Sequence, residues 1–264
     1  MNLFFKRRPK KCSQYSIEMP HVRWWLALTA PQIYQSDDYF DIWLPGMKHK
    51  NNPDRDRDWK ESIQGGWGLD TDDDWFSTIQ TLVAGNMHGQ SWSKFLGERS
   101  LATATEWQHK MQSKDPIFAN EMAFVDMVYR HVDIAGFRAW DYCRGGFLIR
   151  SGYHLGVLNE DEWAFFLNYL AREARYWFSS WEQYCQSYLY GYNVWSYMNN
   201  KQKGVDSTAR LLGSGTPQNY AELFQHINDG QLPLNNILWD TPLPDIAMPV
   251  SVQNRFSAMQ AHED

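Results

Sequence analysis

The sequence has no long apolar run. Its longest candidate, residues 24–28, is soon interrupted by Pro31 and then turns polar, whereas a membrane-spanning helix needs about 20 apolar residues. At the N-terminus, residues 3–5 are apolar and precede the first charges, while a secretory signal places its charges before a long apolar stretch. These absences predict a cytoplasmic protein with no membrane span.

Cysteine and positive charge are also scarce. The three cysteines form no Cys-x-x-Cys pair, which argues against a disulfide scaffold. Lys and Arg number 25 against 31 Asp and Glu, a formal net charge of −6. Nucleic-acid affinity comes from neutralising phosphates, so we expect no nucleic-acid partner. The basic cluster at residues 6–11 is interpreted as a solvated tail, with contact to an anionic surface as the alternative.

Aromatic residues are abundant, at 16% of the chain with 14 Trp. Apolar residues recur at helical spacing along most of the sequence, and period-two alternation is rare. The pattern predicts an all-α fold with a single compact multi-helix domain over residues 21–245. A basic N-terminal arm (residues 1–20), one long loop (residues 35–58) and a Pro-rich C-terminal region leading into a tail (residues 246–264) complete it.

Capping residues locate several helix starts. Thr71 followed by three aspartates predicts one start, Asp115-Pro116 a second, and Asn159 with Glu162 a capping box at a third. Gly85 predicts a helix end. Further helices are expected over residues 23–34, ended or kinked near Pro31, and over the ranges 58–64, 98–113, 133–153, 180–198, 206–212 and 217–228.

A set of spaced motifs resembles a known bacterial family. The segments Trp140-Asp141 with Arg144, Arg150-Ser-Gly-Tyr153 and Ser180-Trp-Glu-Gln-Tyr184 are similar to the core of the "domain of unknown function 1266" family. The resemblance covers about residues 23–245. His88 follows Asn-Met, where the family tends to place a Gly-His, and so departs from its pattern. The resemblance implies a shared helical fold and no assigned activity.

Charged residues on apolar helices are the candidate chemistry. Asp141 and Arg144 share a helix face, and Glu182 lies in similarly aromatic surroundings. With Trp140 and Trp181 as walls they are candidates for a polar pocket, in which a carboxylate acts as base and Arg144 holds an anionic group. The alternative is a buried ion-pair network that fixes helix register. His88 is a further catalytic candidate, with helix capping as its alternative role.

Metal and cofactor motifs are not found in the sequence. Glu106-x-x-His109 has the spacing used by di-iron bundles, but such sites need a second motif and further carboxylates. We therefore expect no metal and no cofactor. The candidate binding residues are aromatic or basic: Trp43, Trp67, Trp140, Arg150, Trp181 and Trp239.

Two functions remain open. The first is a protein–protein interaction or regulatory module, such as a partner-binding, immunity-type or chaperone-accessory protein, because Tyr, Trp and Arg anchor interfaces. The second is an enzyme of unknown class, with hydrolysis as the expected chemistry, built on Asp141, Arg144, Glu182 and His88. The helical tryptophans are interpreted mainly as core, so an aromatic binding surface is expected at loop and edge positions such as Trp43 and Trp239.

Overall fold

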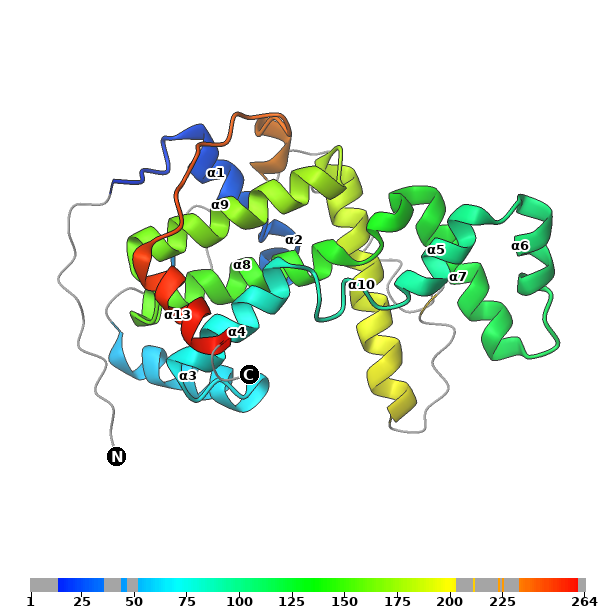
Figure 1. Ribbon diagram of the computed structural model, residues 1–264, viewed down its shortest axis with the longest axis horizontal. Helices are drawn as coiled ribbons and strands as arrows, with labels where there is room; N and C mark the ends of the chain where they lie inside the picture. Colours follow the sequence, from blue (N-terminus) through cyan, green and yellow to red (C-terminus); the bar gives the residue numbers. More distant parts are fainter. Residues whose placement is uncertain are drawn as a thin grey trace. The chain divides into compact units, whose positions relative to one another are not determined.

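The computed structural model describes residues 14–35, 44–46, 52–202, 211, 223, 225 and 233–260, and the regular elements within them are helices (Figure 1). The predicted all-α fold class is therefore confirmed. Trp43 and most of the helices expected at 206–212 and 217–228 lie outside these residues. The chain divides into two compact units: unit 1 is Met1–Ala84, Arg144–Glu173 and Asp240–Asp264, and unit 2 is Gly85–Cys143 and Ala174–Trp239.

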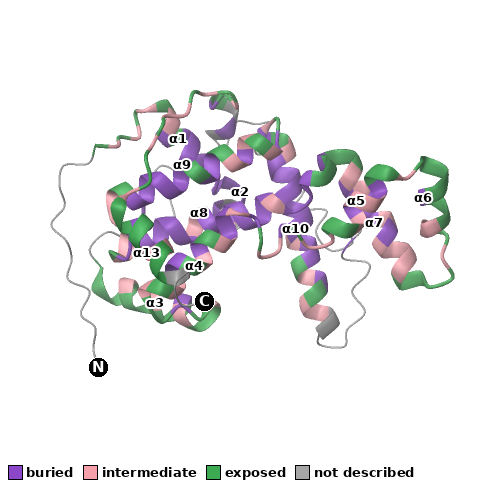
Figure 2. Ribbon diagram, viewed as in Figure 1, coloured by how far each residue is buried: buried purple, intermediate pink, exposed green. Residues whose placement is uncertain are grey.

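Unit 1 has an aromatic core. Trp25 and Trp163 are buried with ring centroids 6.0 Å apart, and Phe76 meets Phe166 at 5.7 Å. The helical tryptophans Trp24, Trp25 and Trp163 are thus core residues, as their spacing predicts. Figure 2 shows buried stretches along the helices that carry them. The helices of this unit are α1 (Pro20–Ala27), α2 (Ala30–Gln35), α3 (Pro53–Trp67), α4 (Asp72–Val83), most of α8 (Arg138–Leu155) and α9 (Glu160–Trp177), and α13 (Val250–Gln260).

The first predicted helix is two helices. The break falls at Leu28 and Thr29, where the Thr29 hydroxyl donates to the Leu26 carbonyl at 2.9 Å. Pro31 stands in the first turn of α2, where a proline costs no helical hydrogen bond. Of the two predicted alternatives, an end or a kink near Pro31, the structure has an end: the first helix stops before the proline, which stands in the first turn of the next.

The predicted long loop ends earlier than expected. Helix α3 begins at Pro53, and the Asn52 side chain caps it by accepting from the Arg55 backbone N–H at 3.2 Å. The alternating charges of residues 54–58, interpreted as loop, form its exposed first turns, with Arg57 and Asp54 3.1 Å apart. A solvated helical face carries charges as readily as a loop does.

The capping predictions are confirmed. Thr71 and Asp74 form a reciprocal capping box at α4, and Asn159 and Glu162 exchange the same pair of bonds at α9. Gly85 follows α4 with φ +68°, a backbone conformation that favours glycine. These boundaries are set within a few residues of sequence, which is why the sequence alone locates them.

Unit 2 is built around α7. Helices α5 and α6 both pack on α7 (Figure 1), and Trp107, Phe124 and Val128 are fully buried there. The prediction of a single helix over 98–113 is wrong, because Thr103 begins a new helix through a capping box with Glu106. The elements are α5 (Ser93–Leu101), α6 (Ala104–Met111), α7 (Pro116–Val132), the 3-10 turns η1 (Asp133–Ala135) and η2 (Pro233–Asn236), α10 (Trp181–Gln202), and parts of α8 and α9.

The segment between η2 and α13 is extended, as the prolines predict. We call residues 240–249 the strap. Its Pro244 carbonyl accepts from Asn168 at 3.0 Å and from Arg172 at 2.8 Å, both on α9. The C-terminal residues expected to form only a tail contain α13, whose Arg255 donates to Asp73 of α4 at 2.9 Å. Both strap and α13 are therefore fixed to unit 1.

Candidate functional site

Asp141 anchors a loop of unit 2. Its carboxylate lies in the first turn of α8, is fully buried, and accepts three consecutive backbone N–H groups on Oδ2. The donors are Met87 at 3.0 Å, His88 at 2.8 Å and Gly89 at 2.7 Å. Backbone donors of this number hold a carboxylate in place and compensate the cost of burying its charge.

The second carboxylate oxygen faces the imidazole of His88. Asp141 Oδ1 is buried and has no hydrogen-bond partner among the described residues, and His88 Nδ1 lies 3.7 Å from it. The His88 side chain is 25% exposed. A shift of about 1 Å would close this contact to a hydrogen bond.

Gly89 makes this approach sterically feasible. A Cβ atom at Gly89 would lie 2.7 Å from the Gly85 carbonyl oxygen, 2.9 Å from Arg138 Cα and 3.1 Å from Asp141 Oδ2. A side chain there would push the loop away from α8. The sequence signal for this loop is the pair of glycines around His88, which sequence reasoning interpreted only as a helix end.

The other catalytic candidates have different surroundings. Arg144 belongs to unit 1, where its guanidinium lies 4.3 Å from the ring centroid of Trp67. Glu182 is exposed in the first turn of α10, whereas Asp141 is fully buried. The geometry therefore joins Asp141 to His88, and a pocket built jointly by Asp141, Arg144 and Glu182 stays a prediction.

The candidate binding residues mostly serve packing. Arg150 is fully buried and donates to Thr29 Oγ1 at 2.6 Å and to the Leu44 carbonyl. Trp181 is 7% exposed, and its indole N–H donates to the Ile237 carbonyl at 2.8 Å. Trp239 is half-buried, with its ring 4.8 Å from that of Trp181. Trp67 is half-buried beneath Arg144.

Trp140 supports an aromatic face on α10 instead. Its ring lies 5.2 Å from Tyr188, 5.8 Å from Tyr192 and 6.0 Å from Trp195. Positions four and three residues apart share a helix face. We call Tyr188, Tyr192, Trp195 and Met198 the α10 aromatic face. Gly191 allows Trp140 to approach, because a Cβ at Gly191 would lie 2.2 Å from Trp140 Cβ.

The outer part of this face is open to solvent. Trp195 is 38% exposed and Met198 39% exposed, and Figure 2 shows exposed and intermediate positions along this half of α10. The helix carries no charged residue from Gln183 to Asn200. The interpretation of helical tryptophans as core is therefore wrong for Trp195, although its spacing from Tyr188 and Tyr192 is the signal that finds the face.

The described residues hold neither a candidate membrane span nor a candidate metal cluster. None of the helices there combines the length and the apolar character that crossing a bilayer requires. No group of three or more His, Cys, Asp or Glu side chains in those ranges is arranged to hold a metal ion.

Comparison with known proteins places the chain in a family. The chain is 27% identical over 133 residues to the uncharacterized protein YbeR of Escherichia coli (strain K12), an alignment that covers 50% of this chain and 56% of that relative. The chain thus spans about half the length of this curated relative. No solved structure matches. A family model described as "Protein of unknown function (DUF1266)" matches residues 62–239, more than half of the chain. The chain therefore belongs to the DUF1266 family.

Proposed function

We propose that this protein is a protein-binding module and that the α10 aromatic face is its docking surface. The observation that supports this is an exposed Trp and Met on a helix with 18 consecutive uncharged residues (183–200). Interface centres are enriched in aromatic residues and Met and depleted in charge. A partner-binding regulator, an immunity-type protein and a chaperone accessory are the roles that such a surface serves.

The preferred partner is a protein that presents an uncharged, apolar surface. Trp195 and Met198 offer rings and a thioether to bury, while the surrounding helix offers no charge for an acidic or basic partner to match. Burial of apolar area then drives association. We therefore expect the affinity to be nearly insensitive to salt, because screening acts on charged pairs.

The compartment proposed is the cytoplasm. Cys143 and Cys185 are both buried thiols that form no disulfide among the described residues. Free thiols are typical of proteins kept in a reducing environment, which supports this compartment.

Site-specific photo-crosslinking tests the docking surface. A benzophenone amino acid replaces Trp195 in the full chain, expressed in its own cells, and a matched variant carries it at Tyr176, which is 77% exposed in the same unit. We expect a discrete adduct with another protein from position 195 and none from position 176. The captured protein is then purified, and W195A should weaken its binding at least tenfold, since central aromatic anchors contribute about 2 kcal/mol or more.

Three results would overturn this proposal. An adduct of twice the chain mass would assign the face to self-association. Adducts of equal yield from positions 195 and 176 would show that the face is not a docking surface. The same conclusion would follow if W195A bound the purified partner with unchanged affinity.

A second candidate function rests on the Asp141–His88 pair. We propose general-base catalysis, with His88 as the base and Asp141 as the residue that orients it, because a buried carboxylate oxygen faces a partly exposed imidazole. Purified protein is assayed on p-nitrophenyl acetate and p-nitrophenyl phosphate, with H88Q as the matched control. Hydrolysis that H88Q retains in full, or no hydrolysis of either ester, would contradict this candidate.

A further inference from the structure

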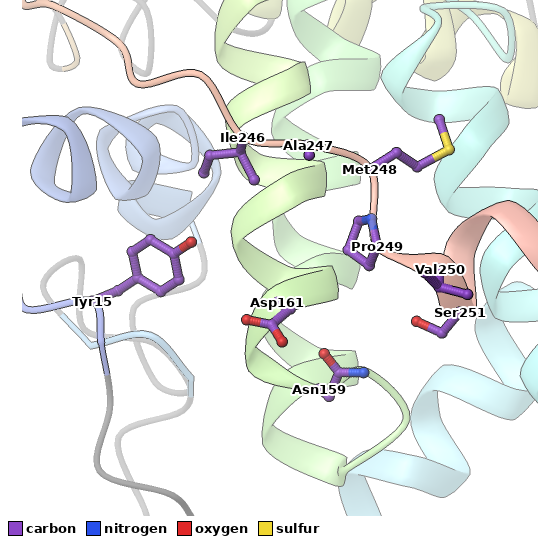
Figure 3. A pocket seen from close by; sticks show the side chains of 9 residues that line it. All are labelled: Tyr15, Asn159, Asp161, Ile246, Ala247, Met248, Pro249, Val250 and Ser251. Atoms are coloured by element: carbon purple, nitrogen blue, oxygen red, sulfur yellow. The ribbon is translucent and has the colours of Figure 1, made fainter.

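Unit 1 contains a cavity of about 410 Å³ outside the surfaces described so far. Its walls come from three parts of the chain: Tyr15 before α1, Asn159 and Asp161 at the start of α9, and residues 246–251, which span the end of the strap and the first residues of α13 (Figure 3). Figure 3 shows the Tyr15 side chain on one side and the Asp161 carboxylate, which points toward it, on the other, with Ile246 above them. Sites of this volume accommodate small organic ligands.

The walls are held in place on each side. Asn168 and Arg172 fix the strap through the Pro244 carbonyl, and Val252 of α13 is fully buried. On the opposite side, the Gln14 side chain donates to Asp161 Oδ1 at 2.7 Å, which fixes the segment that carries Tyr15. The cavity is therefore a built feature of unit 1, with a shape that the surrounding contacts define.

One wall is an exposed apolar run. Residues 246–250 are Ile, Ala, Met, Pro and Val in succession, with Met248 37% exposed and Val250 68% exposed. A run of this length left in contact with solvent is unfavourable unless something binds to it. It supplies the apolar surface that a ligand would cover.

The charge of the opposite wall is negative. Asp161 is the charged residue among those that line the cavity, and Glu160 stands beside it in the chain. Burial raises the pKa of Tyr15, and the nearby charges of Asp161 and Glu160 raise that pKa further. The phenol therefore stays neutral, and its ring face and the carboxylate together form a place for a positive charge.

We propose that this cavity binds a small organic cation: one positively charged nitrogen on an apolar body. The ammonium group lies between the Asp161 carboxylate and the Tyr15 ring, and the apolar body covers residues 246–250. A metal ion would lack the apolar contact, and an anion would meet the Asp161 charge.

Three probes of one shape test the proposal on the full chain. These are 2-phenylethylammonium, the neutral 2-phenylethanol and the anionic 3-phenylpropanoate, and binding is followed by ligand-observed NMR and by amide shifts. We expect the cation to bind about five- to thirtyfold more tightly than the alcohol, the combined effect of one exposed ion pair and one cation–π contact, and the anion to bind most weakly. The shifted amides should include those of residues 15, 161 and 246–251.

Matched variants separate charge from apolar contact. D161N should reduce the preference for the cation to less than about threefold, whereas D58N, an exposed Asp→Asn change on α3 outside the cavity, should leave it unchanged. M248S should weaken the binding of the cation and of the alcohol by the same factor. Far-ultraviolet circular dichroism checks that each variant is folded.

Three outcomes would overturn the proposal. The first is equal affinity for the cation and the alcohol in the unaltered protein. The second is a preference that D161N leaves intact. The third is the lack of saturable binding of the cation by folded protein.

Discussion

Trp140 packs directly on the backbone of α10 at Gly191, with Cβ of Trp140 2.2 Å from the position that a Cβ on Gly191 would take. The contact joins the α10 backbone to the Cβ and Cγ atoms of Trp140. Rotation of a side chain therefore cannot relieve it. It places the indole among Tyr188, Tyr192 and Trp195, and thereby sets the shape of the α10 aromatic face.

G191A should destabilise the protein. The added methyl overlaps Trp140, and overpacking of this kind costs about 1–3 kcal/mol, more than the helix propensity of Ala returns. The matched control is G97A in α5 of the same unit, where a Cβ meets nothing within 4 Å. G97A should stabilise by up to about 1 kcal/mol. Urea unfolding measures the change in the free energy of unfolding for both variants. A change of the same sign in the two would contradict the close contact between Gly191 and Trp140.

D141N should destabilise by about 2 kcal/mol, since it removes the buried charge that three backbone donors share. Amide exchange at residues 87–89 should speed up selectively. D115N is the control, because Asp115 caps α7 through backbone donors and Asn caps a helix about as well as Asp. Equal losses from D141N and D115N would show that Asp141 does not anchor the loop.

The capping box of α4 predicts a pH dependence. The hydrogen bond from the Thr71 hydroxyl, together with its backbone N–H, lowers the pKa of Asp74 from the ordinary 3.8. A carboxyl whose pKa is lower in the folded state stabilises the fold above its unfolded-state pKa, and that stabilisation is lost as pH falls through the folded-state pKa. The stability difference between the unaltered protein and D74N should therefore vanish in strong acid.

Carboxyl NMR titration tests the cause of that shift. T71V removes the hydroxyl and should move the pKa of Asp74 back toward its ordinary value. T81V, on the same helix, removes a hydroxyl that donates to the Ser77 carbonyl and should leave the pKa of Asp74 unchanged. If the pKa of Asp74 is the same in T71V as in the unaltered protein, then a group other than the Thr71 hydroxyl lowers it.

Two tryptophans should differ sharply in their contribution to stability. W195A should cost less than about 1 kcal/mol, because the ring is partly exposed, whereas W163A should cost about 3–5 kcal/mol, because Trp163 is buried. Thermal and urea unfolding measure both. If W195A proves as costly as W163A, then the Trp195 ring is part of the core and not of a docking surface.

Cys185 should be chemically inert in the folded protein. Burial raises the pKa of its thiol well above the ordinary range, and the charge of Glu182 raises it further. In a C12S variant, we expect Cys143 and Cys185, both buried, to react with a chromogenic disulfide reagent only on unfolding. Rapid reaction of the reagent with either thiol in the native protein would contradict the burial of these two cysteines.

The features that the sequence predicted correctly are local ones. Thr71 with Asp74, and Asn159 with Glu162, complete their hydrogen bonds within four residues, so no knowledge of the fold is required. The same signal stands at Thr103 and Glu106, and it explains why residues 98–113 contain parts of two helices and not a single one. Helix α13 carries no comparable start signal, and its Arg255 binds a residue 182 positions away.

The candidate site could be predicted only in part. The residue types Asp141 and His88 were identified, but their pairing depends on backbone donors 52–54 residues from Asp141, which no local pattern records. Likewise, helical spacing predicts that Trp195 shares a face with Tyr188, but not whether that face is covered. Exposure depends on what packs against a helix, and this is a property of the folded chain.

The strap and α13 have a consequence for how the protein is made. Every segment of unit 2 lies before residue 240, whereas unit 1 needs residues 240–260 to bury Val252 and to pair Arg255 with Asp73. During synthesis, unit 2 can therefore fold on the ribosome before residues 240–260, which unit 1 requires, have emerged. Premature termination before residue 240 would leave one folded unit attached to another with an open core, which is the kind of product that quality-control proteases degrade.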